Sequence, residues 1–287
     1  MKKTCSVCGE EALSQMTAYQ KHHLSKCRSC TMVLAHLEPH KRTLEEHYAQ
    51  YGRDDFFSPI TKQRYNEWLD TFEEYREHNR ILDVGCGIGF FLETALERNW
   101  EVFGTEYTDE SVNICEQKGI QMYKGEIENI EFNDLKFDVV VSIEVLEHIS
   151  NPLSHLERIN QILRPGGTLY LTTPNFNSLN RRILGERWNV LAYPEHLSYF
   201  NKKSLNMALS KSGFVKKQLI TEGISLEHLK TSIQKKNVDH STPDTSDERL
   251  RQAAESYYVL KKFKFLANYL LNVVGLGESL KAFYYKS

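Results

Sequence analysis

The sequence predicts an α/β fold, with a mostly parallel sheet that carries helices on both faces and follows a small cysteine-rich module. From residue 80 onward, short apolar runs alternate with amphipathic segments, which is the pattern of a parallel sheet covered by helices. Before residue 40, four cysteines occur as two matched pairs. A chain of 287 residues, of which 40% are hydrophobic, is long and apolar enough for one sizeable domain and a smaller appendage.

The cysteine pairs are Cys5-x-x-Cys8 and Cys27-x-x-Cys30. Four thiolates at this spacing can surround one tetrahedral zinc ion, each pair supplied by a tight turn. Unpaired thiols in a flexible tail, or a redox pair, are the alternatives. Because a shell of four sulfurs leaves no open position for water or substrate, we expect a structural zinc ion in a zinc-ribbon-like module over residues 1–40. Its ligands would be Cys5, Cys8, Cys27 and Cys30.

Residues 41–79 are polar, rich in aromatic side chains and mostly helical in character. We interpret this segment as a helical linker or lid. Aromatic residues of this kind usually pack in a core, so we expect them to pack rather than to contact a substrate directly.

The predicted sheet begins with the strand 80–84, which runs into the loop Gly85-Cys86-Gly87-Ile88-Gly89 and then a helix from residue 90. Glycines let the backbone turn sharply and approach a ligand, and the new helix offers free N–H groups. The next strand is followed by Glu106, whose carboxylate can accept both hydroxyl protons of a ribose. The loop therefore predicts a Rossmann-like nucleotide site, although Phe90 stands where dinucleotide sites carry glycine and disfavours NAD.

With these residues the chain resembles class I S-adenosylmethionine-dependent methyltransferases. The stretch 82–89 is similar to their first motif, 137–142 to their fourth strand, 145–149 to the segment after it, and 163–171 to their fifth strand with its preceding turn. The resemblance covers residues 80 to about 220. It implies a seven-stranded Rossmann-like sheet, a methyltransferase domain over 80–287 and S-adenosylmethionine as the cofactor.

The resemblance also implies a set of cofactor-binding residues. In the family, the counterpart of Asp83 lines the methionine side of the cofactor, that of Glu106 binds the ribose, and the end of the third strand, here Glu126-Ile127, contacts adenine. Glu126 stands where aspartate is commoner, which leaves the adenine amino group to a backbone contact. The whole expected set is Asp83, Gly85, Gly87, Gly89, Glu106, Glu126, Ile127 and Ile143.

The methyl acceptor should bind beyond the carboxyl ends of the strands, beside the cofactor. Methyl transfer from a sulfonium is a direct displacement, so the protein must chiefly align the acceptor and exclude water. In the long loop after the fifth strand, His196 is a candidate general base and Tyr193 a second candidate catalytic residue. Arg181, Arg182 and Arg187 could hold a phosphate or carboxylate of the acceptor. The alternative is that His196 only fixes the loop through hydrogen bonds.

The remaining elements complete the order expected from the resemblance. A helix begins near residue 201, a sixth strand near residue 213, and the last strand covers 279–286. Between them we expect a helical insertion at about 225–275, with a polar flexible part at 231–251 and a helix that follows it. The apolar positions of that helix have helical spacing, and packing on the sheet or dimer formation is favoured over a membrane surface. These positions are Leu260, Phe263, Ala267, Leu270 and Val274.

Charge and hydropathy narrow the function. A net charge of -2 provides no overall basic field for nucleic acid, and neither a secretion signal nor a membrane-spanning run is recognisable, so we expect a cytoplasmic protein, with a homodimer possible. We predict C- or O-methylation of a small anionic acceptor such as a sugar nucleotide or polysaccharide precursor, because a cysteine-rich module ahead of this core resembles sugar C-methyltransferases. The alternatives are a quinone-type O-methyltransferase, an RNA methyltransferase, and a non-enzymatic zinc-ribbon binding module on a methyltransferase scaffold.

Overall fold

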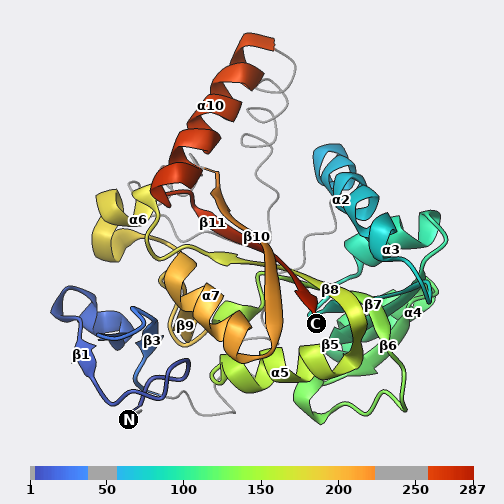
Figure 1. Cartoon of the computed structure of the whole chain (residues 1–287), viewed down its shortest axis with the longest axis horizontal. Coiled ribbons are helices and arrows are strands. Elements are labelled where there is room, and N and C mark those ends of the chain that lie inside the picture. Colours follow the sequence, from blue (N-terminus) through green and yellow to red (C-terminus); the bar gives the residue numbers. More distant parts are fainter. Residues whose placement is uncertain (1–3, 38–56, 224–257) are drawn as a thin grey trace. The chain divides into compact units, whose positions relative to one another are not determined.

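The computed structural model describes residues 4–37, 57–223 and 258–287 (Figure 1). The chain divides into two compact units. Unit 1 combines residues from the ranges 1–56, 173–205 and 220–281. Unit 2 combines residues from the ranges 57–172, 206–219 and 282–287.

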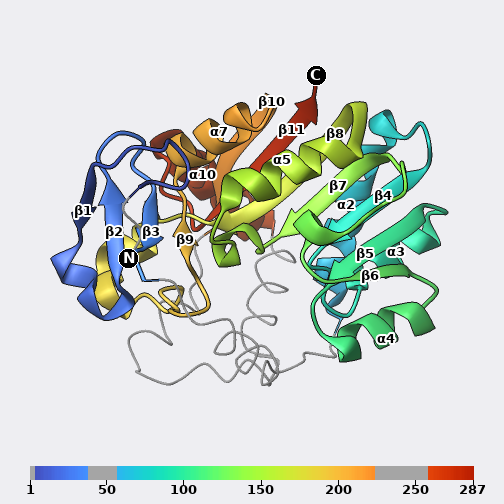
Figure 2. The ribbon, with the colours of Figure 1, turned by 90° about the horizontal axis from the view of Figure 1, so that it is seen from below.

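The larger sheet has seven strands in the order β10-β11-β8-β7-β4-β5-β6. Its strands are β4 (Arg80–Val84), β5 (Glu101–Glu106), β6 (Gln121–Lys124), β7 (Phe137–Ile143), β8 (Leu163–Pro174), β10 (Phe214–Glu222) and β11 (Ser279–Lys286). Neighbours from β8 to β6 pair in parallel, and Figure 2 shows β7, β4, β5 and β6 side by side. The predicted fold class, a Rossmann-like, mostly parallel sheet with helices, is confirmed.

The central strands are buried on both faces, as strands of a parallel sheet must be when helices cover it. In β4, Ile81 and Leu82 are fully buried, and in β7 the consecutive residues Val139, Val140 and Val141 are fully buried as well. Consecutive apolar residues would be costly in a strand with one face in water. The run of β-branched residues in β7 therefore fixes its central position.

The helices of unit 2 follow the strands. They are α2 (Pro59–Phe72), α3 (Phe90–Glu97), α4 (Asp109–Gln117) and α5 (Pro152–Ile162), with short 3-10 turns η2 (Glu73–Tyr75), η3 (Ile127–Asn129) and η4 (Leu146–His148). Proline starts α2 and α5, where its missing N–H costs nothing. The Thr108 side chain caps α4 by accepting the N–H of Ser111. Helix α2 lies in the segment predicted as a helical linker, and residues 41–56 of that prediction lie outside the described residues.

Unit 1 contains a second, four-stranded sheet in the order β1-β2-β3-β9, in which all neighbours are antiparallel. Its strands are β1 (Leu13–Gln15), β2 (Leu24–Cys27), β3 (Val33–Ala35) and β9 (Ser198–Tyr199). The first three strands come from the predicted zinc-ribbon-like module. The fourth, β9, comes from the long segment after β8, a pairing that the sequence did not predict.

The other helices are α6 (Leu179–Leu184), α7 (Lys202–Lys211) and α10 (Tyr258–Val274), with 3-10 turns η1 (Thr17–His22) and η5 (Gly185–Arg187). Helix α10 confirms the helix expected in the insertion, whereas the predicted flexible part at 231–251 lies outside the described residues. Among the described residues, no helix combines the length and apolar character that crossing a membrane requires.

The inward face of α10 differs from the apolar face that the spacing indicated. Leu270 and Val274 are 56% and 61% exposed, whereas Leu271 is buried. The Asn268 and Asn272 side chains face the protein instead and accept backbone N–H groups of residues 223 and 221 at 3.2 and 3.0 Å. Amide side chains can satisfy strand backbone that an apolar face would leave unpaired, which is the physical reason for the difference.

Candidate functional site

The glycine loop that follows β4 is shaped by positive backbone angles. Gly87 has φ 55° and Gly89, the residue before α3, has φ 80°. A Cβ on Gly89 would lie 2.7 Å from the end of the Ile120 side chain, and the positive φ would strain a larger residue there. A Cβ on Gly87 would meet nothing within 4 Å, and its backbone therefore borders open space. The loop leaves room for a ligand to approach the main chain at Gly87.

Glu106 at the end of β5 is tied to this loop. Its Oε2 accepts the N–H of Gly87 at 2.9 Å, and its Oε1 accepts the N–H of Tyr107 at 2.7 Å. Its backbone carbonyl accepts the N–H of Gly125 at 2.9 Å, and this hydrogen bond connects the residue after β6 to the end of β5. Each carboxylate oxygen can accept more than one hydrogen bond. Glu106 thus keeps acceptor capacity for hydroxyl groups while its orientation is fixed.

Asp83, one residue before the end of β4, is the other carboxylate of the site. The residue is 4% exposed, and its Oδ1 has no hydrogen-bond partner among the residues that the structure describes. Burial raises the pKa of Asp83 well above its usual range, and the negative charge of Glu106 raises it further. A cationic ligand beside this oxygen would lower the pKa of Asp83 and favour its charged form.

The remaining predicted cofactor residues lie at the ends of β6 and β7. Glu126 is exposed, and its Oε2 accepts a hydrogen bond from the Asn129 side chain at 3.1 Å. Ile127 is buried at the start of η3, and Ile143, the last residue of β7, is half-buried. Their contacts with a cofactor stay predictions.

Aromatic residues from the N-terminal part of unit 2 pack beside the glycine loop, a contribution that sequence reasoning missed. Phe57 stacks on Phe90, the first residue of α3, with ring centroids 4.6 Å apart and an interplanar angle of 5°. Burial raises the pKa of Tyr65 in α2 to about 12, and the nearby charge of Asp83 adds to this. The aromatic richness of the segment was the only available signal.

Two cysteines line the underside of the loop. The sulfurs of Cys115 and Cys86 lie 3.4 and 3.7 Å from the carbonyl oxygen of Gly87. The Cys115 sulfur raises the pKa of Cys86, and burial raises it further. Cys86 therefore stays a thiol, which agrees with its interpretation as a small space-filling residue rather than a nucleophile.

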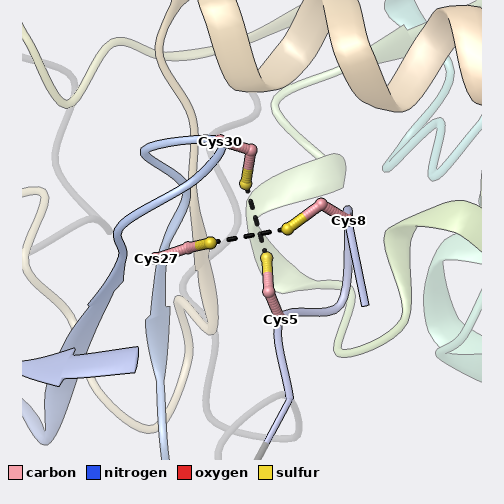
Figure 3. A group of neighbouring side chains, drawn as sticks. All are labelled: Cys5, Cys8, Cys27 and Cys30. Carbon is pink, nitrogen blue, oxygen red and sulfur yellow. Dashed lines mark hydrogen bonds between the residues drawn. The ribbon is translucent and has the colours of Figure 1, made fainter. Parts of the chain in front are cut away.

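The four N-terminal cysteines converge in unit 1 (Figure 3). The sulfurs of Cys5 and Cys30 are 3.5 Å apart, those of Cys8 and Cys27 are 3.4 Å apart, and all four lie within 4.8 Å of one another. A tetrahedral zinc ion with Zn–S bonds of about 2.3 Å places its sulfurs about 3.8 Å apart. The arrangement therefore matches the donor set of a structural zinc site.

The two candidate catalytic residues lie in residues 188–201, which we call the acceptor segment. The Nδ1 atom of His196 is 2.7 Å from the carbonyl oxygen of Val190. Because a carbonyl only accepts, Nδ1 carries a proton in this hydrogen bond, and Nε2 is the other nitrogen of the ring. The Tyr193 ring packs edge-on against His23, with centroids 4.9 Å apart.

The arginines predicted to hold the acceptor differ in environment. The Arg181 Nη1 donates to the hydroxyl of Tyr19 at 2.8 Å, and its guanidinium lies 4.5 Å from the centroid of the Phe176 ring. Arg182 and Arg187 are exposed. The contacts of Arg181 shown by the structure are thus with protein groups of unit 1.

A family model described as a methyltransferase domain matches residues 60–219, more than half of the chain. The chain belongs to this methyltransferase family. The predicted resemblance to methyltransferases is confirmed.

The methyltransferase is also similar to curated and solved proteins. It is 32% identical over 117 residues to ubiquinone biosynthesis O-methyltransferase of Cereibacter sphaeroides, covering 38% of this chain and 47% of that protein. It is 34% identical over 107 residues to the Haemophilus ducreyi enzyme of the same name, covering 33% and 45%. The chain thus spans about half the length of the curated relatives it matches.

Among solved structures, a SAM-dependent methyltransferase from Archaeoglobus fulgidus aligns with a TM-score of 0.54 at 18% identity, covering 86% of this chain and 100% of that one. A phosphoethanolamine N-methyltransferase from Haemonchus contortus aligns with a TM-score of 0.54 at 17% identity, covering 86% and 57%. At these identities the alignments show a shared fold.

The residues of this methyltransferase fit S-adenosylmethionine. The buried Asp83 oxygen, which has no partner among the described residues, suits the positive charge of the cofactor, and Glu106 can accept the ribose hydroxyls. The open backbone at Gly87 gives the cofactor access to the loop. One oriented carboxylate and one buried carboxylate beside a glycine loop thus suit a cationic nucleoside.

Proposed function

We propose that this methyltransferase transfers a methyl group from S-adenosylmethionine to a hydroxyl oxygen of a small-molecule acceptor. The observation that carries the cofactor part is the carboxylate pair: Glu106 is oriented by two backbone N–H groups, and Asp83 is buried with an oxygen that lacks a partner among the described residues. Similarity to curated O-methyltransferases supports oxygen as the acceptor atom.

The cofactor, when bound, supplies a methyl group on a positively charged sulfur. Glu106 would hold the ribose hydroxyls, and Asp83 would balance the positive charge of the cofactor. Because Gly87 donates its N–H to Glu106, the loop and the carboxylate would keep one relative geometry as the ligand binds. This is preorganisation of the binding site, and it lowers the entropy cost of binding.

A hydroxyl acceptor must lose its proton during the transfer, which requires a base. We assign this role to His196. Its Nδ1 proton is donated to the Val190 carbonyl, which sets the ring orientation, so Nε2 would be the atom that takes the proton of the acceptor. Tyr193 is the second candidate, and its ring is held against His23.

For the acceptor class, the similarity to ubiquinone biosynthesis O-methyltransferases favours the quinone-type alternative over the sugar nucleotide predicted from the cysteine-rich module. We therefore propose a hydroxylated aromatic acceptor. We also propose that Cys5, Cys8, Cys27 and Cys30 bind one structural zinc ion. The RNA, binding-module, homodimer and cytoplasmic expectations stay predictions.

The test is a screen of purified protein with methyl-labelled S-adenosylmethionine against two pools, one of hydroxylated aromatic compounds and one of nucleotide sugars. We expect label in the aromatic pool, and at least about 100-fold less with a His196→Gln variant that still binds the cofactor. Label only in the nucleotide sugars would restore the sugar prediction. Cofactor binding by calorimetry with no transfer to either pool would count against an O-methyltransferase and in favour of the binding module.

A further inference from the structure

The zinc-ribbon-like module and the acceptor segment form one sheet. Strand β3 pairs with β9, with Val33 opposite Tyr199 and Leu34 opposite Ser198. The N–H of Ala35 extends this pairing by donating to the carbonyl of Leu197 at 2.9 Å. Leu197 directly follows the candidate base, His196. The backbone of the acceptor segment is therefore hydrogen-bonded to the module on the residue next to the base.

Side chains join the second cysteine turn to the end of the acceptor segment. The Nδ2 of Asn201 donates to the carbonyl of Thr31 at 3.1 Å, and the Nζ of Lys203 donates to the carbonyl of Ser29 at 2.8 Å. Ser29 and Thr31 flank Cys30, one of the four clustered cysteines. These hydrogen bonds connect the Cys27–Cys30 turn to Asn201, the last residue of the acceptor segment, and to Lys203 after it.

The two parts also share a hydrophobic core. Buried side chains from the module pack with buried side chains from the segment after β8. The cluster comprises Tyr19, Leu24, Val33, Ala35, Phe176, Leu184, Trp188, Val190, Leu191, Leu197 and Tyr199. Val190, whose carbonyl orients His196, belongs to this cluster. The environment of the base therefore rests on residues that the module helps to bury.

We propose that the four-cysteine site is a positioning element for the methyl acceptor: a metal ion on the four cysteines holds β3 and the Cys27–Cys30 turn, and these hold the acceptor segment with His196. Strands of three residues have little stability of their own, so the metal bonds supply the order that the sheet requires. The role of His196 within this inference rests on the proposed function. The cofactor residues from Asp83 to Ile143 belong to unit 2, whereas the module and the acceptor segment belong to unit 1.

The experiment uses the full chain with zinc present or removed by a chelator. Hydrogen exchange should show the Ala35 amide and the amides of residues 197–200 exchanging at least about tenfold faster without metal, because a local opening no longer has to break a stable sheet. Calorimetry should show unchanged affinity for S-adenosylmethionine. Methyl transfer should be lost without metal and return when zinc alone is added back.

Three variants distinguish the effect of losing the metal from the effect of losing the contact between the cysteine turn and the acceptor segment. Cys27→Ser removes a ligand and should reproduce the metal-free behaviour. Asn201→Asp keeps the Oδ1 that caps α7 but removes the Nδ2 donor to the carbonyl and the hydroxyl of Thr31, so it should keep zinc, loosen the 197–200 amides and lower turnover. Lys21→Ala is the matched control, since Lys21 is an exposed residue of η1 in the same module but outside the Cys27–Cys30 turn, and it should change none of these properties.

Unchanged exchange at Ala35 in metal-free protein would overturn the inference. Loss of cofactor affinity together with metal would overturn it as well, because the site would then stabilise the whole chain rather than the acceptor segment. If exchange and cofactor affinity behave as expected but zinc-loaded protein methylates no hydroxyl compound, the positioning of the segment stands and the proposed O-methyltransferase function fails.

Discussion

Replacing Glu106 by Gln tests the cofactor half of the site. Both carboxylate oxygens accept backbone N–H groups, from Gly87 at 2.9 Å and Tyr107 at 2.7 Å. A glutamine has one oxygen, so its NH2 group must face one of these two donors and leave it without an acceptor. The variant also loses the charge that strengthens hydrogen bonds to ribose hydroxyls.

The expected loss is of the order of a single hydrogen bond to a charged group, about 2 kcal/mol. This corresponds to a dissociation constant for S-adenosylmethionine raised about 30-fold, since about 1.4 kcal/mol is tenfold. Isothermal titration calorimetry measures it directly. Glu101→Gln is the matched control, because Glu101 lies at the other end of β5 and pairs with Arg80. Equal affinity of both variants and wild type would refute the ribose role of Glu106.

Three further predictions concern other parts of the site. Asp83→Asn should stabilise the cofactor-free protein at neutral pH and weaken cofactor binding. The pKa of Asp83 in the folded protein is raised above its ordinary value of 3.8. The contribution of Asp83 to the free energy of unfolding is therefore fully present below pH 3.8 and is lost as the pH rises through the folded-state pKa. Thermal unfolding from about pH 4 upward should show this decline in wild type and a smaller one in the variant; identical pH profiles would contradict the argument. His196→Gln should lower turnover about 100-fold or more with unchanged cofactor affinity, as expected for loss of a general base, and normal turnover on the true acceptor would return His196 to a structural role. Metal analysis should find one zinc ion per chain and less in Cys8→Ser, whereas a zinc-free protein with native exchange protection in residues 4–35 would exclude the zinc site.

The cofactor half was largely predictable because its signals are local in sequence. The strand at 80–84, the glycines after it and Glu106 lie within 27 residues, and the structure places them together. The last strand, 279–286, also has the predicted bounds, since apolar side chains at alternate positions mark its length. When the parts of a motif are close along the chain, the local backbone structure alone brings them together.

The acceptor half was less predictable because its organisation depends on contacts between distant residues. Strand β9 has two residues, too few to show any periodicity, and its partner β3 lies more than 160 residues earlier. In α10 the apolar positions Leu270 and Val274 are exposed, whereas Asn268 and Asn272 bind backbone groups of the protein. Hydropathy patterns do not record hydrogen bonds of this kind.

The pairing of β3 with β9 has a consequence for synthesis of the chain. All three residues of β3 are buried in the finished protein, and β9 covers its outer edge. On the ribosome β3 emerges long before residues 198 and 199, so during that interval it presents an apolar strand edge, the kind of surface that recruits other chains. Fragments that end before Ser198 should therefore aggregate. The sheet that forms from the first residues of the nascent chain is completed only when the two residues of β9 have been synthesised.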